Sequence, residues 1–140
     1  MTLEQLIEKG MVNRQSADDA EIKGSIALAG RLVVEAKSNM SISLFDVAFT
    51  LAYNSMFHSA RALLFKVGYK ERGHWALIAA LKELYKDGEI QEYLNILDIY
   101  RVTRHGIQYD GDLSSELDSN NAIKDAEAWL KVVKKTLKVR

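Results

Sequence analysis

The sequence of 140 residues contains no cysteine and no proline. The absence of cysteine excludes disulfides, thiolate metal sites and cysteine nucleophiles. The absence of proline leaves long helices uninterrupted, and the abundance of Ala, Leu, Lys and Glu favours helix over sheet. We therefore predict one all-α domain that spans residues 1–140 and has no convincing β-strand.

An excess of charge of either sign is also missing, since 19 basic residues balance 19 acidic ones. A strongly basic surface commonly drives non-specific binding to nucleic acid, so any contact with RNA must here be local. One basic cluster stands at the C-terminal end, where it either solvates a helix and complements its dipole or binds phosphate. Its members are Lys131, Lys134, Lys135, Lys138 and Arg140.

No long apolar run is free of polar residues. The most apolar region, residues 44–67, contains Asp46, Asn54, His58 and Arg61, which indicates a core helix rather than a membrane span. The first eight residues lack the basic start and the apolar run of a signal peptide. We predict a cytoplasmic protein without membrane association.

Apolar residues spaced three and four apart predict six helices that pack as an up-and-down four-helix-type bundle with extra short helices. We expect Ser16 to cap the second helix, Ser41 or Ser43 to cap the third, and Gly68 to end the third in a left-handed conformation. The expected helices are a short one within residues 1–11, a second from Ala17, a third to about Val67, a fourth after Gly73 that ends near Asp87, a fifth from Glu89 to about Tyr109, and a last one after a polar break at 110–119.

Two arginines continue the apolar row of the fifth helix. Leu94 and Leu97 are followed at the same spacing by Arg101 and Arg104, which places charge on a stripe that faces the core. Arginine stays protonated, so it must bind carboxylates, phosphates or a partner surface if this stripe is buried. Either both side chains pair with acids or extend to the bundle's end, or they bind a ligand. The candidate acids are Asp46, Asp98, Asp110 and Asp112.

His105 lies one turn after Arg101 and is either a surface histidine or a general acid or base, because its ordinary pKa is close to neutrality. The three histidines, His58, His74 and His105, are scattered and form no metal-ligand motif, so we expect no metal and no other cofactor.

The third helix carries a polar line at a four-residue period, formed by Asp46, Thr50, Asn54 and His58, with Arg61 close to its end. Such a line is usually the solvated side of a helix. The other interpretation is a cleft or dimer seam in which Asn54 and Arg61 face the arginines of the fifth helix.

Four segments in order resemble the HEPN domain. They are AYNSMFHSARALL at 52–64, GY at 68–69, GH at 73–74 and RVTRHGIQYD at 101–110, and the opening LIEKGMV at 6–12 fits a branch of the same family. The resemblance implies a helical bundle that forms a homodimer about the helices carrying these segments, with one composite cleft across the two-fold axis.

In active HEPN ribonucleases, an Arg, a polar residue, three variable residues and a His act without metal. Placed on this sequence, that pattern gives Arg104, His105 at the polar position and Tyr109 where the histidine would stand. Tyrosine followed by Asp110 is similar to a HEPN branch whose members are not clearly nucleases.

The resemblance therefore implies a binding module whose cleft holds RNA, a nucleotide or a partner protein. The partner that the family suggests is a minimal nucleotidyltransferase encoded alongside, in a toxin–antitoxin or defence system. The binding residues that we predict are Arg101, Arg104, Asn54, Arg61 and Asp110.

The alternative is a metal-independent endoribonuclease in which Arg104 stabilises the phosphoryl transition state and His105 or Tyr109 moves protons. Tyrosine is a poor base near neutral pH because its pKa is about 10, and His105 lies a full helical turn before the family's histidine position. We therefore favour binding over cleavage. In a third, purely structural role the arginines would only form salt bridges.

Overall fold

The computed structural model describes residues 1–140 and consists of six helices and one short two-stranded ribbon. This arrangement confirms the predicted all-α helical bundle. None of the helices combines the length and the apolar character needed to cross a membrane. The elements are α1 (Leu3–Glu8), β1 (Val12–Arg14), α2 (Asp19–Ser41), α3 (Phe45–Lys66), β2 (Tyr69–Glu71), α4 (His74–Leu84), α5 (Gly88–Tyr109) and α6 (Glu116–Leu137).

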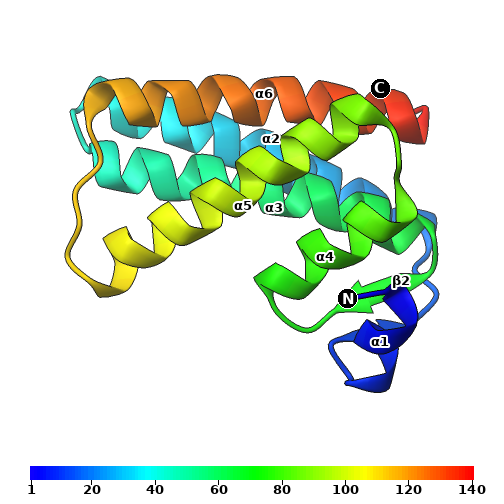
Figure 1. The fold of residues 1–140 in the computed structure, drawn as a ribbon. Coiled ribbons are helices and arrows are strands. Elements are labelled where there is room, and N and C mark those ends of the chain that lie inside the picture. The colour runs from blue at the N-terminus through cyan, green and yellow to red at the C-terminus, as the bar shows by residue number, and fades with distance from the viewer.

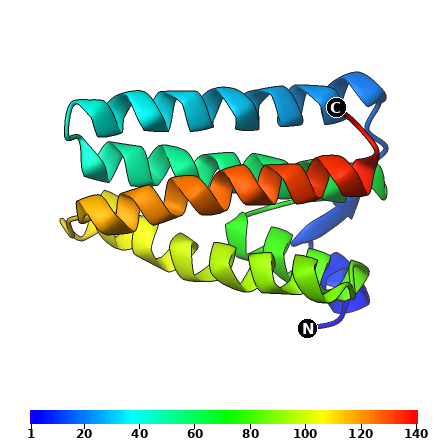
Figure 2. The same ribbon diagram turned by 90° about the horizontal axis from the view of Figure 1, so that it is seen from above.

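Helix α3 is the centre of the bundle, because it packs against α2, α4, α5, α6 and β2. Figures 1 and 2 show the four long helices together, with α2 and α5 on opposite sides of α3 and α5 running obliquely across it. More than half of the α3 residues are buried. The most apolar helix of the sequence thus takes the position in which most of its surface is covered by other elements.

Two polar side chains inside this core, Ser55 and Trp129, are bonded to the backbone of a neighbouring helix. The Ser55 hydroxyl donates to the Ala29 carbonyl at 2.7 Å, which joins α3 to α2. The indole N–H of Trp129 donates to the Met56 carbonyl at 3.1 Å, which joins α6 to α3. Buried donors with partners avoid the cost of lost hydration, so these bonds fix the register of the three helices.

The two strands are a difference from the prediction of no strand. They pair antiparallel, with Val12 opposite Glu71 and Arg14 opposite Tyr69. Each strand has three residues, too few for an alternating pattern to be recognised in the sequence, and the two are far apart along the chain. The ribbon attaches α1 to the end of the bundle near both termini (Figure 1).

Two of the predicted helix caps are wrong. Helix α2 is capped by Asp18, whose carboxylate accepts from the Glu21 amide at 2.8 Å, rather than by Ser16. Helix α3 has no side-chain cap: its N-cap position is Leu44, and Ser43 adopts a left-handed conformation with φ 60° in the tight turn after α2. In both places the helix begins one or two residues later than the nearest serine predicted. The spacing of apolar residues does not resolve a shift of this size.

The glycine at the end of α3 agrees with the prediction, since Gly68 has φ +86°. Gly73, the N-cap of α4, has φ +113°, a conformation that side chains rarely tolerate. It turns the chain out of the ribbon and places His74 at the first position of α4, next to α3. Helix α4 ends at Leu84, three residues before the predicted Asp87.

Candidate functional site

The two arginines of α5 are held in different ways. Arg101 pairs with Asp98 one turn earlier, with 2.9 Å between Nε and Oδ1, so one of the candidate acids does neutralise it. Arg104 has no carboxylate within salt-bridge distance. Asp46 accepts a hydrogen bond from the loop after α5, and the Asp112 side chain lies against Gly106. Of the two arginines, therefore, only Arg104 carries an uncompensated charge.

Arg104 lies over the aromatic ring of Tyr53 from α3, with 5.1 Å between its Cζ atom and the ring centroid. One terminal nitrogen donates to the Gln108 side-chain oxygen at 2.7 Å. Its Nε atom is buried and has no hydrogen-bond acceptor. A partly buried guanidinium with no counterion is suited to bind an anion, because a phosphate supplies the missing negative charge.

Tyr53 and His74 form a hydrogen-bonded pair beneath this guanidinium. The Tyr53 hydroxyl and His74 Nδ1 are 2.6 Å apart, and the imidazole stacks on the Phe57 ring at a centroid distance of 4.1 Å. Burial raises the pKa of Tyr53 to about 12, although the neighbouring Arg104 charge acts in the opposite direction. The phenol is therefore protonated, and His74 Nδ1 is the acceptor available to it, since a guanidinium has donors only.

His74 is uncharged at neutral pH. Burial, together with the positive charges of Arg104, Arg61 and Arg101 and with His58, lowers its pKa to about 4. With Nδ1 accepting from Tyr53, the single ring proton is on Nε2. His74 is thus a neutral N–H donor fixed among cationic groups from α3 and α5.

Arg61 is committed to a structural bond. Its Nε and one terminal nitrogen both donate to Glu71 Oε1 at 2.6 Å, and the Glu71 side chain is only 1% exposed. The Arg61 guanidinium also lies 5.3 Å from the Phe57 ring centroid. This residue therefore ties strand β2 to α3, and it reaches the site only through the effect of its charge on the pKa of His74.

The remaining predicted residues lie around this cluster. Asn54 follows Tyr53 on α3 and is partly exposed. His105, Tyr109 and Asp110 are exposed at the C-terminal end of α5, where the rings of His105 and Tyr109 are 4.8 Å apart. The structure brings Arg101 and Arg104 together with Tyr53 and His74, whereas His105 and Tyr109 form a separate exposed pair.

The loop after α5 explains what the other acids do. The Asp46 carboxylate accepts from the Ser114 amide at 2.5 Å, which joins the loop to α3. The Asp112 side chain lies against the Cα of Gly106, where any β-carbon would collide with it. The glycine next to His105 in the motif therefore leaves room for the Asp112 carboxylate, which would have to move if a β-carbon were added.

The outward side of α5 is apolar where solvent would favour polar residues. Ile99 and Val102 are 62% and 60% exposed, and the Tyr109 ring is on the same side of the helix. Exposed apolar groups gathered on one helix are typical of a surface that contacts another protein. This surface is on the same helix as Arg101 and Arg104, on the side that faces away from α3.

The C-terminal basic cluster lies elsewhere. Lys134 and Arg140 join Lys23 of α2 at the rim of a pocket of about 430 Å³ whose lining includes Ile22 and Ile26. This pocket lies between α2 and α6, whereas Arg104 faces α3 and α4. It is therefore not part of the candidate site. Nowhere in the chain do three metal-binding side chains converge.

The sequence did not indicate that Tyr53 belongs to the site, or that its hydroxyl bonds to His74. These residues are 21 positions apart and on different helices, so periodicity within one helix carries no signal of their contact. The available signal was the Gly73-His74 pair among the segments that resemble a known family, together with a glycine at the start of a helix.

Comparison with protein-family models matches residues 23–136 to the HEPN domain. The matched region runs from the first turns of α2 to the last turn of α6 and contains every residue of the Arg104 cluster. No curated protein matches the chain.

Proposed function

The chain belongs to the HEPN family, and from that premise we propose that it is a cytoplasmic homodimer that binds RNA or a nucleotide through Arg104 and Arg101. Family membership supports a module related to nucleotides or RNA in general. The observation that carries the finer proposal is the unneutralised Arg104 guanidinium, which has no carboxylate within salt-bridge distance.

The charges around His74 support an anionic ligand. Of the three arginines that lower its pKa, Arg61 is paired with Glu71 and Arg101 with Asp98. One net positive charge therefore remains, on Arg104, and the neutral His74 adds a hydrogen-bond donor without adding charge. A phosphate oxygen would accept from both, which makes a phosphodiester or a nucleotide phosphate the ligand that fits this chemistry.

A second copy of the chain would strengthen this site. One unpaired cation gives weak phosphate binding, and a homodimer would add a second Arg104 site for the same RNA strand. Ile99 and Val102 supply the exposed apolar surface for such a contact. The whole of residues 1–140 would act as one domain in this dimer.

The proposed partner is a minimal nucleotidyltransferase encoded alongside, in a toxin–antitoxin or defence setting. Its support is the resemblance to the family, in which such pairs occur. Co-expression of this chain with the product of a neighbouring nucleotidyltransferase gene, followed by co-purification, tests the pairing. Two proteins that separate at micromolar concentration would remove the partner from the proposal.

The decisive test is the Arg104→Ala variant in a fluorescence anisotropy titration with a labelled single-stranded RNA, and in calorimetry with ATP. We expect affinity to fall by about tenfold or more, because a charge-assisted hydrogen bond to phosphate is lost. Arg31→Ala is the matched control, since Arg31 is exposed on α2 and faces away from the site. Equal losses in the two variants, or none in Arg104→Ala, would refute the proposal.

The same preparations distinguish binding from cleavage. RNA that is cut in the presence of EDTA by the wild type, but not by Arg104→Ala, would replace this proposal with a metal-independent endoribonuclease. His105→Ala and Tyr109→Phe would then show which of the two exposed rings moves protons.

A further inference from the structure

The two tryptophans of the chain have opposite environments. Trp129 is fully buried, stacks on Tyr93 and donates its indole N–H to a carbonyl in the core. Trp75, in the first turn of α4, is 40% exposed, lies outside the core cluster and makes neither an aromatic contact nor a hydrogen bond through its indole. A large flat side chain that contributes little to the core is available for a ligand.

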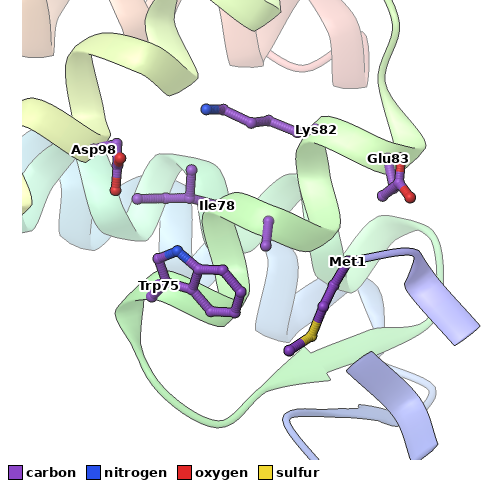
Figure 3. A pocket seen from close by; sticks show the side chains of 7 residues that line it. Met1, Trp75, Ile78, Lys82, Glu83 and Asp98 are labelled. Carbon is purple, nitrogen blue, oxygen red and sulfur yellow. The ribbon is translucent and has the colours of Figure 1, made fainter. Parts of the chain in front are cut away.

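Trp75 forms one wall of a pocket of about 210 Å³ between α4, α5 and the N-terminus. Figure 3 shows the indole at the edge of this pocket, with Ile78 beside it and Met1 across from it. These apolar surfaces suit a flat ring, which could stack on the indole and contact Ile78 with its edge.

The polar side of the pocket consists of Lys82, Glu83 and Asp98. Glu83 pairs with Lys86, and Asp98 pairs with Arg101. The ammonium group of Lys82 has no carboxylate partner, and it extends over the pocket in Figure 3. The pocket thus offers one free cation beside its apolar wall, which favours a ligand that is flat and also anionic.

The pocket borders the Arg104 cluster at two points. Trp75 directly follows His74 in α4, and the Asp98 carboxylate both lines the pocket and bonds to Arg101 Nε at 2.9 Å. The guanidinium of Arg101 is therefore one hydrogen bond away from the pocket wall. A flat ring in the pocket and an anion on the arginines would belong to a single ligand of modest size.

We propose that this pocket receives the base of a single-stranded RNA whose adjacent phosphate is bound by Arg104 and Arg101, with the base stacked on Trp75. The inference rests on the proposed function and adds to it a base subsite and a preference for single strands. Stacking on an aromatic side chain accepts every base, whereas a base within a duplex has no free face to offer. Lys82 would contact the next phosphate or a base carbonyl.

The test measures binding of two labelled ten-nucleotide RNAs by fluorescence anisotropy: oligo(A), and an analogue with the same backbone and no bases. For Trp75→Ala we expect a five- to tenfold loss of affinity for oligo(A), at the lower end of the range for base stacking because the indole is only partly enclosed. Affinity for the abasic strand should not change. Trp75→Phe should restore most of the loss, which a merely structural role in folding would not predict.

Intrinsic fluorescence gives a second readout. Addition of oligo(A) should quench Trp75 emission, whereas the buried Trp129 remains as a constant background that persists in Trp75→Phe. Val34→Ala, at an exposed apolar position on α2, is the control for unspecific effects of surface substitutions. Melting curves recorded by circular dichroism establish that each variant is folded.

The outcomes separate this inference from the function on which it rests. If Arg104→Ala weakens both strands but Trp75→Ala weakens neither, the phosphate site stands and the base subsite is wrong. If Trp75→Ala weakens both strands equally, the indole does not contact a base. If the wild type binds neither strand at millimolar concentration, the proposed RNA binding fails and the subsite with it.

Discussion

Three arginines of similar sequence context have different roles because of what lies within reach of each guanidinium. Arg61 meets the buried Glu71, Arg101 meets Asp98, and Arg104 meets the face of Tyr53 with no acid nearby. A partly buried cation without a counterion costs stability unless a ligand supplies the missing charge. The position of a single carboxylate thus separates a structural arginine from a binding one.

These differences could be predicted only in part from the sequence. Asp98 was among the candidate acids because it is one turn from Arg101 on the same helix, and contacts of that kind follow from helical spacing. The ring beneath Arg104 and the carboxylate bound to Arg61 come from other elements. Their identity depends on how α3, α4 and the ribbon pack, which no local pattern specifies.

His74 provides a prediction about pH at the scale of one residue. Its pKa of about 4 in the fold lies below its ordinary value of 6.5, so the unfolded chain binds more protons between these pH values. The stability that depends on neutral His74 is therefore present above pH 6.5 and decreases as the pH falls towards 4. Since His74 is only half-buried, we expect a contribution of about 1–2 kcal/mol.

The measurement compares urea unfolding of the wild type and His74→Gln at pH 7 and at pH 4.5. The wild type should lose about 1–2 kcal/mol more than the variant, and the shared titration of carboxylates and of His58 cancels in the difference. An NMR titration in which the His74 ring protonates near its ordinary pKa would contradict the prediction.

At the scale of elements, the long helices were predictable because the apolar pattern that specifies each one lies within its own residues. Apolar rows in α2 and α6 repeat every three or four residues over several turns, and the buried residues of both helices follow them. The ribbon was missed because its pairing joins segments on either side of two long helices. Its three-residue strands leave no periodic signal.

The Arg61–Glu71 pair makes a prediction about how the ribbon is held. Arg61→Met removes the only partner of a carboxylate that is almost fully buried, and we expect a loss of about 2–4 kcal/mol in the free energy of unfolding. Adding Glu71→Gln should recover at least half of this loss, because the buried charge is removed as well. Urea unfolding of the single and double variants measures both values.

One further variant controls this experiment. Arg31→Met removes an exposed arginine and should change stability by less than about 0.5 kcal/mol. A double variant that is less stable than Arg61→Met alone would show that the bond between the two side chains is not what attaches the ribbon.

At the scale of the whole molecule, the exposed apolar residues of α5 predict an association between two copies. Ile99→Glu should shift the protein from dimer to monomer, because a carboxylate would lose its hydration in the interface. Sedimentation equilibrium measures this, with Val34→Glu on α2 as a control at an equally exposed apolar position. A wild type that is monomeric at 100 times the concentration used for the RNA titration would exclude the dimer.

The ribbon also determines how far the chain can be shortened. The match to the family starts at residue 23, yet strand β1 and helix α1 precede it and cover β2 and part of α4. A polypeptide trimmed to the matched boundaries would leave the Tyr69–Glu71 backbone unpaired and the apolar groups beneath Leu6 open to water. Open strand edges recruit other chains, so such a fragment would be prone to precipitate even though it keeps most of its four long helices.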